Sequence, residues 1–102
     1  MVNSKLELIE LIKLHTNLLH KYGVKDIYLF GSFSRNEVTE KSDVDLLIDF
    51  ESNKKTLMNI IEIGDFLESI FGRKVDIITR NDLSKFIGPH ILNSMEHLSL
   101  AA

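Results

Sequence analysis

The sequence contains no cysteine, so disulfide bonds, thiolate metal sites and cysteine nucleophiles are excluded. It also lacks any apolar run near the roughly 18 residues that a membrane-spanning helix needs. The N-terminal stretch MVNSKLELIELIKLH carries charges throughout, unlike the apolar segment of a secretory signal peptide. These absences predict a cytoplasmic protein that does not cross a membrane.

Basic residues are in short supply as well. Lysine and arginine number 12 against 15 aspartates and glutamates, which gives a formal net charge of −3. Nucleic-acid-binding proteins usually show a clear basic excess, so this balance argues against a nucleic-acid substrate. With 102 residues, 44 % of them hydrophobic, the chain is expected to form a single domain over residues 1–102 with a real core.

The periodicity of the apolar residues predicts how helices and strands follow one another. Helices are expected over residues 4–22, 32–38, 57–71 and 90–98. Strands are expected over residues 26–31, 43–50 and 74–79. A further helix is expected to begin at Asn81 or Asp82, which are good capping residues. Alternation of this kind is typical of an α/β protein with a small mixed or parallel sheet flanked by helices.

Two aspartates interrupt the apolar run DVDLLIDF, which should be a buried strand. Asp43 and Asp45 point to the same side because side chains alternate along a strand. Aspartate is depleted in strands, and two carboxylates on one face repel each other. A divalent cation offsets that repulsion, and Mg²⁺ prefers such hard oxygen ligands. The pair is therefore a candidate Mg²⁺ site; the alternative is an open strand end with its aspartates in water.

A third aspartate lies in the apolar run KVDIIT. If the strand that holds Asp76 lies beside the strand of Asp43 and Asp45, the three carboxylates converge and can hold two metal ions. Asp49 shares the face of the first pair but lies further along the strand, so it is not expected to be a ligand.

A glycine and a serine stand where the first strand gives way to a short helix. Backbone N–H groups at a helix start attract phosphate, and Gly31 would let a phosphate come close to the main chain. The hydroxyl of Ser32 can donate one more hydrogen bond. The alternative is an ordinary turn with a serine N-cap. Combined with the three carboxylates, the turn predicts a site for a nucleoside triphosphate and a metal.

The segment GSFSR…SDVDLLI with the later VDII resembles the minimal nucleotidyltransferases, small members of the polymerase β-like superfamily, over about residues 22–79. That family reads G-S, a spacer of about ten residues, D-x-D and a third aspartate. The matching residues are Gly31, Ser32, Asp43, Asp45 and Asp76. Family members often read G-S-x-A-R-G, whereas this chain has Ser34 and Asn36 at the alanine and glycine positions. Arg35 matches the arginine.

The resemblance implies a reaction, a cofactor and a partner. ATP would bind with two Mg²⁺ ions, its triphosphate against Gly31 and Ser32. The catalytic aspartates Asp43, Asp45 and Asp76 would hold the metals while a hydroxyl attacks the α-phosphorus. Arg35 either contacts the triphosphate or a partner, or it is a surface arginine paired with Glu37 or Asp49. Relatives of this size are often antitoxins that adenylylate a tyrosine of a helical HEPN ribonuclease toxin.

Two rivals to this function stay open at this point. The first is an antitoxin that neutralises its toxin by binding alone, although such a binder gains nothing from clustered carboxylates. The second is a transferase for a small hydroxylated molecule, with an acceptor pocket built at the interface of a homodimer.

Overall fold

A computed structural model describes residues 1–79 and 95–100 of the chain. The helices are α1 (Lys5–Leu14), α2 (Thr16–Lys21), α3 (Gly31–Ser34) and α4 (Leu57–Phe71). The strands are β1 (Val24–Phe30), β2 (Val44–Phe50), β3 (Val75–Ile78) and β4 (Glu96–Leu98). Within the described ranges, every helix is too short or too polar to span a bilayer.

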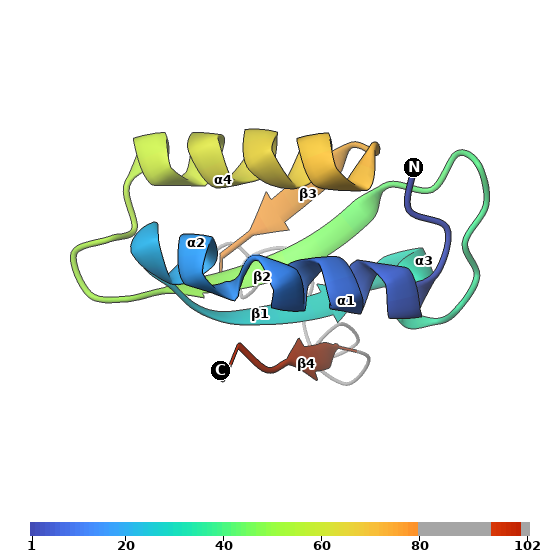
Figure 1. Ribbon diagram of the computed structural model, residues 1–102, viewed down its shortest axis with the longest axis horizontal. Coiled ribbons are helices and arrows are strands. Elements are labelled where there is room, and N and C mark those ends of the chain that lie inside the picture. Colours follow the sequence, from blue (N-terminus) through green and yellow to red (C-terminus); the bar gives the residue numbers. More distant parts are fainter. Residues whose placement is uncertain (80–94, 101–102) are drawn as a thin grey trace.

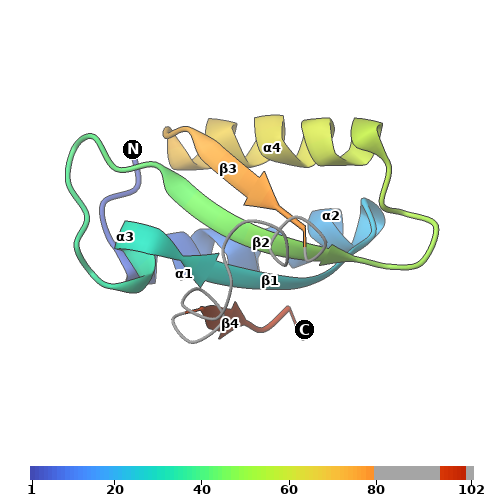
Figure 2. The same cartoon turned by 180° about the vertical axis from the view of Figure 1, so that it is seen from behind.

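The four strands form one sheet in the order β3-β2-β1-β4. β2 runs antiparallel to β1 and parallel to β3, and β4 is antiparallel to β1. α1, α2 and α4 cover one face of this sheet, and the view from behind shows the strands in front of them (Figures 1 and 2). The predicted α/β fold, a small mixed sheet flanked by helices, is confirmed.

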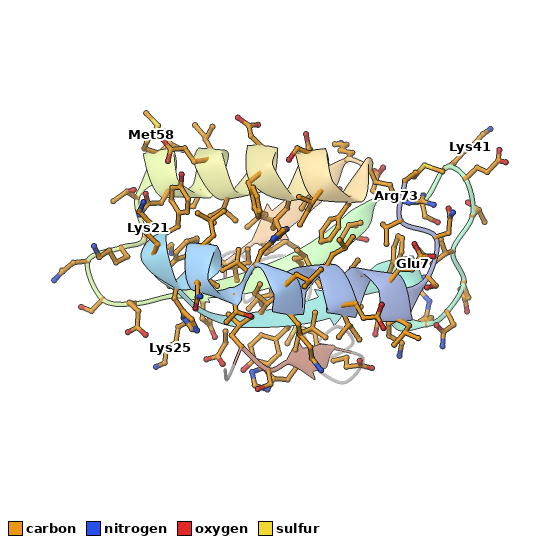
Figure 3. The ribbon with its side chains drawn as sticks, in the orientation of Figure 1. Glu7, Lys21, Lys25, Lys41, Met58 and Arg73 are labelled. Atoms are coloured by element: carbon orange, nitrogen blue, oxygen red, sulfur yellow. The ribbon has the colours of Figure 1, made fainter. Side chains whose placement is uncertain are left out.

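The main hydrophobic core lies between the helices and the covered face of the sheet. From α4 it takes Ile63, Leu67 and Phe71, all fully buried. The apolar residues of α4 cover an arc wider than one stripe, and only part of that arc is buried in the core. Three apolar side chains near the start of α4 are exposed, and Met58 points away from the body of the molecule (Figure 3). They are Leu57, Met58 and Ile61.

The helix boundaries follow from local chemistry. The hydroxyl of Ser4 accepts a hydrogen bond from the Glu7 N–H at 3.1 Å, which confirms one of the two expected caps of the first helix. Thr56 caps α4 in the same way through the Asn59 N–H. Gly72 ends α4 at φ 67°, in the left-handed region that glycine adopts without a steric penalty.

The expectation of one continuous helix over residues 4–22 is wrong, because the helix is interrupted at His15. The Thr16 hydroxyl donates to the Lys13 carbonyl at 2.9 Å, a side-chain bond that competes with the helical ladder. The ring of His15 packs edge-on against Phe66, with centroids 5.1 Å apart. His15 thus lies at the edge of the core.

The expected last helix over residues 90–98 is also wrong where the structure describes it, because residues 96–98 form β4. Leu98 and Leu100 are buried on the helical side, so their spacing of two residues matches a strand. Glu96 pairs with Lys5 at 2.9 Å, and His97 Nε2 lies 2.8 Å from an oxygen of Asp26. Residues 90–94 and the helix expected from Asn81 or Asp82 lie outside the described residues.

Replacing Leu67 by alanine should lower the free energy of unfolding by about 2–5 kcal/mol, because a fully buried leucine leaves a cavity. Replacing the exposed Leu57 of the same helix is the matched control, with an expected change within about 0.5 kcal/mol. Urea denaturation followed by circular dichroism measures both. Equal effects of the two substitutions would contradict the packing of α4 described above.

Candidate active site

The parallel pairing of β2 with β3 brings two carboxylates together. Asp45 and Asp76 are opposite each other in the register, and hydrogen bonding between their side chains is one of the causes that raise the pKa of Asp45. Both side chains lie on the face of the sheet away from α4, since their neighbours Leu46 and Ile77 contribute to the core on the helical side. The two strands are neighbours, as the predicted convergence of three carboxylates required, and their pairing brings two of the three aspartates together.

Asp43 lies in the loop before β2, two residues from Asp45. It lies one residue outside the strand, which begins at Val44, and it is exposed. Its charge nevertheless acts on Asp45. Asp49 belongs elsewhere: it lies opposite Asp26, four residues and roughly 14 Å along the strand from Asp45.

The electrostatic interactions of the cluster act on the carboxyl group of Asp45. Burial raises the pKa of Asp45, and the negative charges of Asp76 and Asp43 and the hydrogen bond to Asp76 raise that pKa further. The charge of Arg35 works in the opposite direction. Carboxylates that repel one another in this way are stabilised by a shared proton or by a cation.

The glycine of the turn after β1 is in direct contact with this cluster. Gly31 has φ 73°, and a Cβ placed on it would collide with Oδ2 of Asp45. α3 begins at this glycine, and its N-cap residue Phe30 makes no side-chain hydrogen bond to the first turn. The leading N–H groups of a helix have no intrahelical acceptor, so this turn offers donors to an anion beside the carboxylates.

The two residues that depart from the family pattern, Ser34 and Asn36, are compatible with the conformation of this turn. Asn36, at the position where relatives often have glycine, has φ 57°, a conformation that asparagine tolerates better than most residues. Arg35 pairs with Glu37 through Nε and Oε2 at 3.2 Å, and both side chains are more than half exposed. This is the surface pairing expected as the alternative for Arg35, although its charge also acts on Asp45.

Lys74 is a neighbour of the site that the sequence reasoning did not single out. Its Nζ lies 3.7 Å from Oδ1 of Asp76. The available signal was the spacing K-V-D, which puts lysine and aspartate on the same face of an extended chain. Because both side chains are about half exposed or more, the pair contributes little to stability.

The donor set fits Mg²⁺. The charges of Asp43 and Asp76 both act on Asp45, which lies against the Gly31 turn, and Mg²⁺ commonly takes one or two carboxylates together with substrate phosphates. In the part of the chain that the structure describes, no three acidic or histidine side chains form a ready-made metal cage. An ion would therefore be completed by ligands from its substrate, as is usual for Mg²⁺.

A family model described as a nucleotidyltransferase domain matches residues 11–100. The chain belongs to the nucleotidyltransferase family. This nucleotidyltransferase is 36 % identical over 81 residues to the protein adenylyltransferase MntA of Thermococcus cleftensis, covering 79 % of this chain and 81 % of that protein. It is 39 % identical over 92 residues to MJ1379 of Methanocaldococcus jannaschii, provisionally named a protein adenylyltransferase, with coverages of 88 % and 89 %.

Solved structures show the same fold as this nucleotidyltransferase. One, provisionally described as a minimal nucleotidyltransferase, superposes with a TM-score of 0.69 at 28 % identity, over 86 % of this chain and 93 % of the other. A second, described as a toxin–antitoxin with AMP-PNP, gives a TM-score of 0.68 at 22 % identity, over 85 % of this chain and 70 % of the other. The resemblance inferred from the sequence is therefore confirmed at the level of family and fold.

Replacing Asp45 by asparagine should raise the melting temperature of the metal-free protein by about 2–5 °C at pH 7. The raised pKa of Asp45 means that folding disfavours its charged form, so the metal-free native protein loses stability as pH rises from the ordinary aspartate pKa through the raised one. The variant avoids this loss. Thermal scans in EDTA at pH 4 and pH 7 measure the effect, which should be smaller at pH 4.

Mg²⁺ supplies the complementary test. It should stabilise the native nucleotidyltransferase but not the Asp45→Asn variant, because only a ligand bound to the native state raises its stability. The Asp49→Asn variant, changed on the same face of the same strand, is the matched control and should keep the response to Mg²⁺. A metal response that survives in Asp45→Asn would contradict the assignment of this carboxylate.

Proposed function

We propose that this nucleotidyltransferase transfers AMP from ATP, in the presence of Mg²⁺, to a hydroxyl group of a partner protein, and that it acts as an antitoxin. The proposed partner is a helical HEPN-type toxin, and the proposed acceptor is a tyrosine. The observation that carries the proposal is the contact of Gly31 with Asp45, which in turn lies opposite Asp76. A phosphate-binding turn and paired carboxylates on one small surface suit the transfer of a phosphorus group.

The reaction forms one bond and breaks one. The acceptor oxygen attacks the α-phosphorus of ATP, the bond from that phosphorus to the oxygen bridging to the β-phosphate breaks, and pyrophosphate leaves. The acceptor proton passes to a nearby base, for which we propose Asp76. Gly31, Ser32 and Arg35 bind the triphosphate in this scheme, through backbone N–H groups, a hydroxyl and a guanidinium respectively.

The carboxylates would hold two Mg²⁺ ions, with Asp43 and Asp45 shared between both and Asp76 completing the one on the acceptor side. When bound, such ions neutralise charge on the phosphates and favour the ionised form of the attacking hydroxyl. The residues of the chain fix where this happens. Asp45 is held by pairing on both sides, with Phe30 of β1 and Asp76 of β3, so its position changes little on binding.

A protein acceptor is supported by the relatives. Two of them carry names that assign protein adenylyltransferase activity, one of these provisionally, and a structure of the same fold is described as a toxin–antitoxin with AMP-PNP. The exposed apolar side chains of α4 also leave surface for a partner. Because the reaction consumes ATP, the same proposal places the protein in the cytoplasm.

The two rivals meet specific obstacles. A small-molecule transferase needs an acceptor pocket, whereas the names of the relatives point to a protein acceptor. A binding-only antitoxin would gain nothing from the repulsion between Asp45 and Asp76, which raises the pKa of Asp45. Both rivals remain outcomes of the experiment below.

The proposal predicts label transfer from α-³²P-ATP to a protein in lysate of the source cell, in the presence of Mg²⁺. The Asp43→Ala/Asp45→Ala variant should reduce this labelling by more than about 100-fold, because even changes in the outer shell of a metal site cost 10- to 100-fold. Gel electrophoresis and autoradiography measure the labelled bands. The Asp49→Asn variant is the matched control and should label as well as the native chain.

Three results would count against the proposal. A labelled small product without any labelled protein would favour the small-molecule transferase. Equal labelling by the native chain and the double variant would remove the carboxylates from the chemistry. Capture of a toxin without any transfer, by native and variant chains alike, would favour the binding-only antitoxin.

A further inference from the structure

Among the described residues, one charged side chain is buried, that of Arg73, and it has no role in the chemistry proposed above. Arg73, between α4 and β3, is only 7 % exposed. Its Nε donates to the Val2 carbonyl at 2.6 Å, and its Nη1 donates to the carbonyls of Thr39 and Ser42 at 2.9 and 2.7 Å. Its Nη2 donates to Oδ1 of Asn3 at 3.3 Å. The side chain lies where the N-terminal segment meets the end of α4 (Figure 3).

Burying a charged side chain is costly unless its hydrogen bonds are made, and these four hydrogen bonds offset that cost for Arg73. All four acceptors are neutral oxygens rather than carboxylates. The guanidinium also lies over the ring of Phe33, with its carbon 5.2 Å from the ring centroid. Only arginine presents five N–H donors in a flat, rigid fork, so a lysine at this position would lose most of these contacts.

Two of the four hydrogen bonds of Arg73 hold the N-terminal segment; the other two, and the contact with Phe33, reach the two segments that build the candidate active site. Ser42 directly precedes Asp43, and Thr39 closes the same loop through a backbone hydrogen bond from the Ser42 N–H at 3.1 Å. Phe33 directly follows Ser32 in α3 and is fully buried. One side chain therefore connects the loop before Asp43 to the turn for which we propose phosphate binding.

The backbone of Asp43 is in fact held on both sides by the segment after α4. The carbonyl of Ser42 accepts from Arg73, and the N–H of Val44 donates to the carbonyl of Lys74 at 2.9 Å. Asp43 itself is exposed and outside β2, so sheet pairing does not fix it as it fixes Asp45. An exposed ligand on a loop needs such support if it is to meet a metal ion without reorganisation.

We propose that Arg73 is a positioning residue, which sets the main chain of Asp43 and the α3 turn so that metal and nucleotide meet a preformed site. The proposal rests on the proposed function, because it takes Asp43 as a metal ligand. A merely structural role would lower the stability of the fold and leave the metal affinity of the folded protein unchanged. Metal affinity is therefore the readout that separates the two roles.

The test is the affinity for Mn²⁺ alone, used as a spectroscopic substitute for Mg²⁺ and measured by electron paramagnetic resonance below the unfolding transition. Arg73→Lys should weaken Mn²⁺ binding about 10- to 100-fold, as outer-shell changes do at metal sites. Leu67→Ala is the control, because it destabilises the core without touching the site. It should bind Mn²⁺ like the native chain. Equal affinity of Arg73→Lys and the native protein would overturn the proposal.

A second variant decides the matter if Arg73→Lys does not fold. Phe33→Leu keeps an apolar side chain in the core and removes the ring beneath the guanidinium. It should weaken Mn²⁺ binding in the same direction by about 2- to 5-fold, in keeping with the modest strength of a cation–π contact. Unchanged affinity in Phe33→Leu would then overturn the positioning role.

Comparing the native chain with Asp45→Asn tells whether the role of Arg73 fails by itself or because the proposed function fails. If native protein binds Mn²⁺ and Asp45→Asn does not, the metal site stands and the Arg73 variants test positioning alone. If native protein and Asp45→Asn bind Mn²⁺ equally weakly, both alone and with ATP present, the proposed function loses its metal site, and the role of Arg73 falls with it.

Discussion

The mutual repulsion of Asp45 and Asp76 is the constraint around which the rest of the site is arranged. Parallel pairing of β2 and β3 forces the two carboxylates side by side, where burial and like charge both disfavour ionisation of Asp45. Apolar residues at these positions would give a more stable sheet. Keeping carboxylates at these positions costs stability, and such a cost is common at functional sites.

The two faces of the sheet differ in content: one carries most of the hydrophobic core, and the other carries the paired aspartates. The helical face holds most of the core, including the side chains of β2 that alternate with the aspartates. The other face carries a smaller apolar cluster around Phe30 and Leu47, with Asp45 and Asp76 at one end of it. Changes to the aspartates can therefore alter function without dismantling the core. Arg73 connects the core with the candidate site, since this buried side chain donates to the carbonyl of Ser42, the residue before the exposed Asp43.

Much of this arrangement was predictable from local rules. The apolar runs around Asp45 and Asp76 predicted the two strands that place these aspartates opposite each other, and the apolar spacing predicted α4 over residues 57–71. β4 was missed because it is three residues long and pairs with β1, some 70 positions away. Arg73 was missed because nothing near it in sequence reveals its burial. Its acceptors lie 31 to 71 positions away, and the fold alone brings them together.

A crystal structure of the chain with Mg²⁺ and the α,β-methylene analogue of ATP, which cannot release pyrophosphate, tests the central claim most directly. The account predicts a metal ion bound by the carboxylates of Asp45 and Asp76, with the phosphates on the N–H groups that begin α3. Nucleotide bound away from Gly31, or metal and nucleotide bound while the two carboxylates stay without a cation, would contradict it.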